Sequence, residues 1–294
     1  MILQALCDYY QRNQDLPRLG FETKAIPFVI EINAAGELVQ ITDTREQDGK
    51  KKVARNFVVP QGVKKTSGVA SNLLWDNAEY VLRAVGAEKL AYMKPDKRKS
   101  YRSRLRDMRN AFIAEIKALP EQSDAGLLAV LNFLASDFKQ MKANRRRLKA
   151  DPMWAEIVEG NPVLTFRLNG DTELVCQRHA IRAMLVNASS DAEKVTCLIR
   201  GESDDFERLH ASIKGVWGAQ SSGANIISFN KEAFNSFGKA QGANSPVGKQ
   251  AAFAYTTALN YLLSKESTQR IQVGDASTVF WSEKATDFES EVVS

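Results

Sequence analysis

Residues 28–42, FVIEINAAGELVQIT, contain the clearest secondary-structure signal in the chain. Apolar and polar residues alternate from Phe28 to Ile32 and again from Leu38 to Thr42, which is the period of a half-buried β-strand. The segment between them, Asn33-Ala34-Ala35-Gly36, ends in a glycine that can adopt a positive φ. The stretch therefore predicts a β-hairpin and provides the strand half of the fold.

Further elements are predicted on both sides of this hairpin. Apolar residues that recur every three or four positions predict helices over residues 2–13, 69–82, 96–119, 124–149 and 248–263. Short apolar runs predict strands over 53–59, 163–168, 195–199 and 226–229. A glycine-rich segment over 61–68 precedes the second helix, and Asp124 is expected to cap the fourth.

These elements indicate an α+β fold, with a mixed N-terminal hairpin and sheet, helices, and a second α+β lobe. We expect an N-terminal α+β region with a basic loop over residues 1–92 and a helical pair with a basic stripe over 93–151. The second lobe is predicted over 152–285. The polar and acidic residues 286–294 are expected to form a disordered tail.

Composition excludes several protein classes. With 294 residues, 44% of them hydrophobic, the chain can bury a substantial core. Cys7, Cys176 and Cys197 are too widely spaced for a C-x-x-C pair, so neither a disulfide framework nor a zinc site is indicated. No run approaches the roughly 18 apolar residues of a membrane span, and the apolar N-terminus is too short for a signal peptide. We expect a soluble, cytoplasmic protein without a membrane partner.

Positive charge is concentrated in three segments, although the formal net charge is only +5. Residues 45–65 contain seven basic and two acidic residues, 94–109 contain eight and two, and 139–149 contain six and none. Such segregation is typical of surfaces that follow a nucleic-acid backbone. Solvated helix and hairpin faces have the same composition, and both interpretations remain open.

Residues 50–77, KKKVARNFVVPQGVKKTSGVASNLLWDN, combine these charges with amides and small residues. Lysine and arginine suit phosphates, asparagine and glutamine suit base edges, and glycine and serine permit close backbone approach. This stretch is therefore the first candidate for nucleic-acid recognition. The alternative is a basic hairpin and loop that only face water.

Motifs of common enzymes are missing from the sequence. No Gly-Lys-Ser/Thr closes a phosphate loop, no Gly-x-Ser-x-Gly occurs, and His179 and His210 have no partner at metal-ligand spacing. We expect a non-catalytic protein without a cofactor. The alternative is a Mg²⁺-dependent nuclease with Asp43, Glu46 and Asp48 as oxygen ligands, although such a cluster is more often a polar turn.

Two long segments carry a resemblance to a known family: PQGVKKTSGVASNLLWDNAEYVL at 60–82 and ISFNKEAFNSFGKAQGANSPVGKQAAFAYTTALNYLL at 227–263. Together with MILQALCDYYQR at the N-terminus and DTREQDGKKKVARNFVVPQG after the hairpin, they resemble the large subunit of the type I-C CRISPR effector complex, Cascade. The resemblance covers nearly the whole chain. It implies a longer protein, of which this chain is expected to be the N-terminal portion, without the C-terminal part that resembles the helical small subunit.

The resemblance also implies a function. In this family, guide RNA reads the target by base pairing, while the large subunit recognises a short motif beside the target in double-stranded DNA. The subunit is implied to promote R-loop formation, to hold the displaced strand and to help recruit the helicase-nuclease. Implied partners are therefore DNA, guide RNA, other Cascade subunits and the helicase-nuclease. Phage anti-CRISPR proteins that imitate DNA are further candidates, and a docking module for acidic proteins is a third reading of the basic faces.

Candidate binding residues follow from this function and from side-chain chemistry. We expect motif reading by Gln61, Lys64, Lys65, Thr66, Ser67 and Asn72. We expect DNA-backbone contacts from Lys50, Lys51, Lys52, Arg55, Arg102, Arg106, Arg145, Arg146, Arg147, Lys239, Gln241 and Asn244. Asn72 is the preferred base reader, with helix capping as its alternative role. Trp75 is expected in the core, while Phe234 and Phe237 could brace their loop or stack on an unpaired base.

Overall fold

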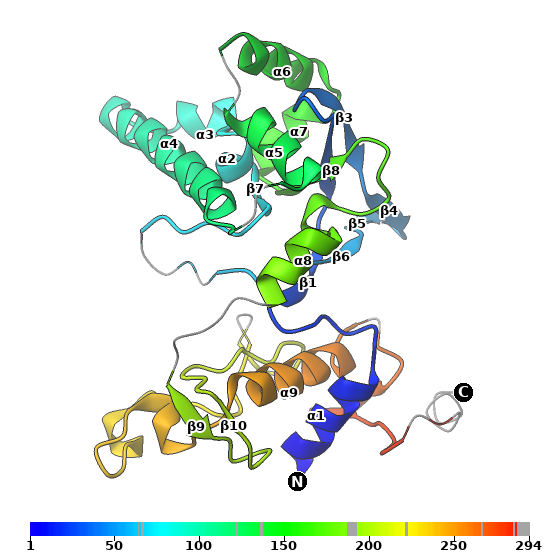
Figure 1. Cartoon of the computed structure of the whole chain (residues 1–294), viewed down its shortest axis with the longest axis vertical. Helices are drawn as coiled ribbons and strands as arrows, with labels where there is room; N and C mark the ends of the chain where they lie inside the picture. Colours follow the sequence, from blue (N-terminus) through cyan, green and yellow to red (C-terminus); the bar gives the residue numbers. More distant parts are fainter. Residues whose placement is uncertain are drawn as a thin grey trace. The chain divides into compact units, whose positions relative to one another are not determined.

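The predicted hairpin forms part of a four-stranded sheet in the order β3-β2-β8-β7. Strands β2 (Phe28–Ile32) and β3 (Leu38–Asp43) are antiparallel, and Gly36 in their turn has φ 77°. A Cβ atom at Gly36 would lie 2.5 Å from the backbone nitrogen of Phe133, so the turn also needs glycine for close packing. Strand β8 (Val163–Leu168) pairs parallel to β2, and β7 (Trp75–Asn77) pairs antiparallel to β8 (Figure 1).

The computed structural model describes residues 1–63, 65, 68–120, 123–135, 138–186, 193–220, 223–265, 267–284 and 286. It divides into two units. One unit is Gly20–Ala188, and the other combines Met1–Leu19 with Ser189–Ser294. The first unit contains the four-stranded sheet, and each unit has its own hydrophobic core.

In the unit Gly20–Ala188, helices pack on the sheet around aromatic side chains. The ring of Phe166 in β8 lies 6.3 Å from Phe112 of α4 (Pro95–Lys117) and 5.7 Å from Phe133 of α5 (Ala125–Ala135). The other helices are α2 (Ala78–Val81), α3 (Ala87–Ala91), α6 (Phe138–Ala150), α7 (Trp154–Gly160), α8 (His179–Val186) and the 3₁₀ turn η1 (Val175–Gln177). Two antiparallel pairs complete the unit: β1 (Phe21–Ala25) with β6 (Asn56–Pro60), and β4 (Arg45–Asp48) with β5 (Lys51–Ala54).

The other unit is built on two helices that lie side by side, α1 (Ile2–Arg12) and α9 (Lys249–Leu262) (Figure 1). Leu6 and Cys7 of α1 are buried with Tyr255 of α9, and the Cys7 thiol donates to the Ala251 carbonyl at 3.6 Å. Two strand pairs and two 3₁₀ turns surround them: β9 (Lys194–Thr196) with β10 (Ser203–Asp205), β11 (Arg270–Val273) with β12 (Ala276–Val279), η2 (Glu232–Phe234) and η3 (Gln241–Asn244).

Several predictions from the sequence are confirmed. The fold is α+β, and the helices expected at 2–13, 96–119 and 248–263 and the strand at 163–168 are α1, α4, α9 and β8. Asp124 caps α5, because its Oδ1 accepts a hydrogen bond from the Leu127 amide at 3.0 Å.

The helix predicted over residues 69–82 is wrong. Residues 75–77 form β7, helix α2 spans only Ala78–Val81, and Leu74 has φ 62°, which interrupts any helix that would cross it. The Asp76 carboxylate accepts from the amides of Asn72 and Asn77 at 3.0 and 2.8 Å. Local side-chain bonds of this kind compete with the helical hydrogen-bond pattern, and pairing with β8 favours the strand.

Other predicted elements differ in extent. The strand at 226–229 is wrong: the segment bends, and the nearby pairing joins Ile213 to Ala224 instead. The strand at 53–59 is divided between β5 and β6, and only the start of 195–199 belongs to a strand, β9. The helix at 124–149 is found as α5 and α6, with residues 136–137 between them outside the described residues.

The two units divide the chain at different residues from the predicted segments 1–92, 93–151 and 152–285. The reason is long-range pairing: β2 bonds to β8, and α1 packs on α9, so each unit joins parts of different predicted segments. Most of the predicted tail, residues 287–294, lies outside the described residues. Within the described parts of the chain, no helix combines the length and apolar character needed to cross a membrane.

Candidate nucleic-acid interface

The first candidate surface is the segment 61–72, which we call the 61–72 loop. Its start is fixed to neighbouring strands, because the Gln61 amide donates to the Gly20 carbonyl at 2.8 Å. Trp75 is buried beneath it, as predicted, and its indole Nε1 donates to the Pro60 carbonyl at 2.8 Å. A Cβ atom at Gly62 would lie 3.1 Å from the Trp75 ring, so glycine lets the loop lie close to the indole.

Asn72 closes the loop from within. Its side-chain Oδ1 accepts a hydrogen bond from the Val63 amide at 2.9 Å, and the residue is 6% exposed. Asn72 therefore holds the two ends of the loop together rather than capping a helix. The prediction that Asn72 reads a base would require this buried hydrogen bond to break.

Asp76 organises the same region from β7. Its buried carboxylate accepts from Lys65 Nζ at 2.7 Å through each oxygen, and from Ser71 Oγ at 3.2 Å, in addition to its two backbone partners. Lys65 Nζ also lies 3.8 Å from the ring centroid of Tyr80. The charge of Lys65 is thus compensated inside the protein, which reduces its availability for a phosphate.

The remaining loop residues are exposed where they are described. Gln61 is exposed, and its carboxamide has no hydrogen-bond partner among the described residues. Gly68 is exposed with φ 79°, and its carbonyl accepts from Arg104 of α4 at 3.4 Å. Lys64, Thr66 and Ser67, three of the predicted readers, lie outside the described residues.

The second candidate surface is the pair of strands β4 and β5, which we call the β4–β5 hairpin. Lys50, Lys51, Lys52 and Arg55 are all exposed on it or beside it, in agreement with a role in backbone contact. The Lys52 ammonium lies 4.0 Å from Asp43, and the Arg55 guanidinium lies 5.5 Å from the ring centroid of Phe57. These are weak restraints at a surface, so the hairpin presents mobile positive charge.

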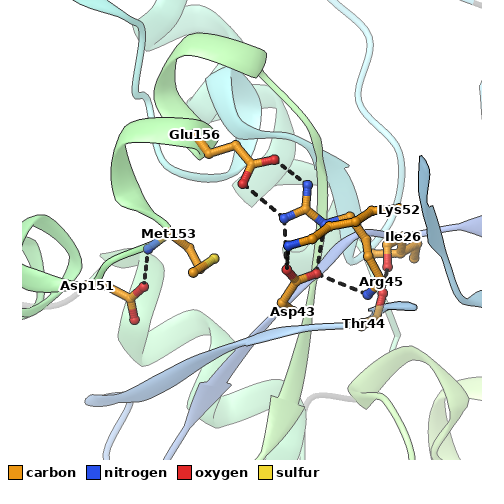
Figure 2. Close-up of polar contacts among 8 residues, drawn as sticks. All are labelled: Ile26, Asp43, Thr44, Arg45, Lys52, Asp151, Met153 and Glu156. Carbon is orange, nitrogen blue, oxygen red and sulfur yellow. Dashed lines mark hydrogen bonds and ion pairs between the residues drawn. The ribbon is translucent and has the colours of Figure 1, made fainter. Parts of the chain in front are cut away.

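The proposed magnesium ligands at the base of this hairpin do not converge. Figure 2 shows that Asp43 faces Arg45, which donates to it through Nε and Nη2 at 2.8 Å each and also binds Glu156. Hydrogen bonds from Arg45 lower the pKa of both carboxyl groups, Asp43 and Glu156. Glu46 is exposed, as is Asp48. Among the described residues, no three His, Cys, Asp or Glu side chains are placed to hold a metal ion.

Two helices carry the predicted arginines of the middle segment. Arg102 and Arg106 are exposed on α4. Arg145, Arg146 and Arg147 are exposed on α6, while Asn144 and Leu148 form its buried side. Arg147 additionally donates to the Leu38 carbonyl at 3.3 Å. The structure therefore places these arginines toward solvent but on separate elements.

The third candidate surface, residues 235–244 of the other unit, is called the 235–244 loop. Asn244 holds it together: its Oδ1 accepts from the Ser236 amide at 2.8 Å, and its Nδ2 donates to the carbonyls of Lys239 and Gln241 at 3.2 and 3.0 Å. Gln241 accepts a hydrogen bond from Arg208, and Lys239 is exposed. Of the three predicted contacts, only the Lys239 side chain faces solvent without a described partner.

Phe237 stands at the tip of this loop with its side chain fully exposed. Phe237 and Gly238 have φ 52° and 70°, and the Lys239 amide donates to the Ser236 carbonyl at 2.9 Å, which defines a tight turn with two positive φ angles. Phe234, three residues earlier, is 48% exposed. Phe237 therefore does not brace the loop, and of its two expected roles only stacking matches its position.

Sequence reasoning missed Asp76 and Arg104, which contact the 61–72 loop from β7 and α4. A buried aspartate is rare without a partner, so the apolar run Leu73-Leu74-Trp75 before Asp76 was a usable signal for an internal ion pair. Nothing in the sequence identified Lys65 as that partner.

A family match covers almost the whole chain. Residues 6–294 match the family model described as CRISPR-associated protein (Cas_Csd1). No curated protein matched the chain.

Proposed function

The chain belongs to the Csd1 family of CRISPR-associated proteins, and we propose that it is the non-catalytic subunit that recognises the motif flanking the target in double-stranded DNA. The observation that carries this proposal is the architecture of the 61–72 loop. Asn72 and Asp76 hold its ends, while Gln61 and Gly68 face solvent. A loop that is fixed at its base and exposed beyond it can enter a groove without losing its shape.

Each part of this surface has a separate physical task. Gln61 reads a base edge, because a free carboxamide offers one donor and one acceptor side. Lys50, Lys51 and Lys52 of the β4–β5 hairpin bind phosphates and raise affinity for all sequences alike. Asn72 acts indirectly, by keeping the loop in the conformation that presents Gln61.

We further propose that the 235–244 loop contacts the displaced strand. Phe237 offers an exposed ring on a rigid turn, and Lys239 supplies a neighbouring cation. An aromatic ring beside a positive charge is the common arrangement for stacking an unpaired base without sequence preference. Guide RNA, the other Cascade subunits and the helicase-nuclease complete the proposed set of partners, since motif recognition starts an opening that base pairing then extends.

Binding to duplexes that differ only in the flanking bases tests the main proposal. Gln61→Ala should reduce discrimination at one flanking position by about 1–3 kcal/mol, the usual value for a bidentate base contact. Lys51→Ala is the matched control, and it should weaken all duplexes equally while lowering the salt slope by about 0.9. Unchanged discrimination in Gln61→Ala would assign the reading to other residues of the loop.

Incubation of the chain with labelled DNA and Mg²⁺ tests the non-catalytic part of the proposal. We expect no cleavage, because Arg45 already binds Asp43. Cleavage that disappears in Asp48→Ala would instead support a nuclease.

A further inference from the structure

One flank of α4 lines a strongly positive cavity. The cavity has a volume of about 590 Å³ and is lined by Arg83, Pro95, Arg98, Lys99, Arg102, Ser103 and Arg106. Five of these seven residues are cationic, and no carboxylate lines the cavity. Like charges gathered in this way raise the free energy of the empty protein, and a bound anion removes that cost.

The cations are not neutralised from the surrounding structure. Within the described chain, Arg83, Lys99 and Arg102 have no ion-pair or hydrogen-bond partner. Arg98 is oriented by two backbone carbonyls, because its Nε donates to Met93 at 2.8 Å and its Nη2 to Ala91 at 3.0 Å. Carbonyl partners fix the guanidinium in place without cancelling its charge.

Arg83 occupies a backbone position that normally selects a different residue. It follows the last turn of α2 with φ 51°, a left-handed conformation in which helices usually place glycine. A side chain with a Cβ costs about 1 kcal/mol or more there. An arginine kept at that cost, with its side chain in the cavity lining, points to a ligand that the guanidinium contacts.

Arg109, one turn further along α4, shows how positive this region is. Its Nη2 donates to the Leu134 carbonyl at 3.1 Å, but its Nη1 is buried without a partner among the described residues. Burial, together with the charge of Arg83, lowers the pKa of Arg109 to about 9. A bound anion near Arg83 would relieve this repulsion as well.

The cavity faces away from the 61–72 loop. At 3.6 residues per turn, Arg102 and Arg104 differ by about 200° around the axis of α4. Arg104 contacts the loop through Gly68, whereas Arg102 lines the cavity. The loop and the cavity thus lie on opposite flanks of one helix, and a ligand of the cavity is separate from the bases that the loop contacts.

We propose that this cavity binds the phosphodiester backbone of a nucleic-acid strand. Arg98, Arg102 and Arg106 recur every four residues and span about 12 Å of helix axis. One strand carries a phosphate roughly every 3.4 Å of duplex, so this row can contact about three phosphates. The planar fork of arginine fits phosphate oxygens in pairs.

The lining favours nucleic acid over an acidic protein. Protein interfaces place apolar and aromatic side chains at their centre. Here the centre is arginine and serine, and Pro95 is the single apolar residue in the lining. The inference goes beyond the proposed motif recognition, because it concerns a strand without any flanking motif and a different flank of α4.

Salt-dependent binding of the chain to a fluorescent oligothymidylate tests the proposal. The double variant Arg102→Gln/Arg106→Gln should bind more weakly, and its slope of log affinity against log salt should fall by about 1.4, or 0.7 for each lost phosphate contact. Between 50 and 200 mM salt, each lost contact should reduce the fold change in affinity by about 2.6-fold. Arg83→Gly should lower the slope by about 0.7 without lowering the melting temperature, since glycine suits the left-handed backbone.

Arg104→Gln is the matched control, because it removes the same charge from the opposite flank of the same helix. It should keep the parental slope with oligothymidylate. Discrimination between flanking motifs in duplexes should stay unchanged in the double variant, so that failure of this proposal and failure of the motif proposal give different results. A parental slope in the double variant would overturn the inference. So would displacement of the oligonucleotide by polyglutamate at lower concentration, which would identify an acidic protein as the occupant.

Discussion

The 61–72 loop and the 235–244 loop solve the same problem in different surroundings. In each, an asparagine side chain bonds across the loop: Asn72 to the Val63 amide, and Asn244 to the Ser236 amide and two carbonyls. Asn72 is buried and works beside a buried carboxylate, whereas Asn244 is half-buried and works among polar groups. The first loop presents polar residues and the second presents a phenyl ring.

The difference shows that burial, more than the number of hydrogen bonds, decides what a loop asparagine contributes. A bond made by a buried amide has no replacement from water when its partner is removed. A bond at the surface exchanges with water at little net cost. We therefore expect the 61–72 loop to depend more steeply on its internal contacts than the 235–244 loop does.

Removal of the Asp76 carboxylate should have the largest effect. Asp76→Ala leaves the amides of Asn72 and Asn77 without their acceptor and Lys65 without its counter-charge. We expect a loss of about 3 kcal/mol in the free energy of unfolding, the lower end of the range for breaking a buried ion pair. Urea unfolding followed by Trp75 fluorescence measures this loss.

Asp107→Ala is the control for that experiment, because Asp107 is an exposed aspartate of α4. It should change the free energy of unfolding by no more than about 0.5 kcal/mol. If the two variants unfold at the same urea concentration, Asp76 does not support the loop in solution.

The two asparagines themselves give the next effect. Asn72→Ala should destabilise its unit by about 2 kcal/mol, because it orphans the buried Val63 amide. Asn244→Ala removes more hydrogen bonds but should cost only about 1 kcal/mol, because water replaces them. Hydrogen exchange of the Val63 and Ser236 amides reports each loop directly. The opposite order of exchange rates would contradict the role given to burial.

Local sequence signals predicted a large part of the fold. The hairpin at 28–42, the helices at 96–119 and 248–263 and the Asp124 cap depend on residues close in sequence, and all are found. The parallel pairing of β2 with β8 and the packing of α1 on α9 join distant segments, which periodicity does not encode. The division into units therefore could not be derived from pattern alone.

The candidate site shows a similar limit. Composition correctly drew attention to residues 50–77 as a polar, cationic stretch, and the lysines of the β4–β5 hairpin are exposed. It did not separate residues that face outward from those that hold the loop. Asn72 and Lys65 have the chemistry of DNA contacts, yet both are engaged by partners that only the fold brings near, Val63 and Asp76.

The smallest expected effect concerns the tip of the 235–244 loop and has the opposite sign. Phe237→Gly should raise the melting temperature by about 2 °C, because glycine adopts φ 52° without the strain of a Cβ atom. Phe237→Ala removes the same ring but keeps the strain, so it should melt with the parent. Gly238→Ala, at φ 70° in the same turn, should lower the melting temperature. Equal melting of Phe237→Gly and Phe237→Ala would mean that the turn relaxes in solution, and the fixed presentation of the ring would then have no structural basis.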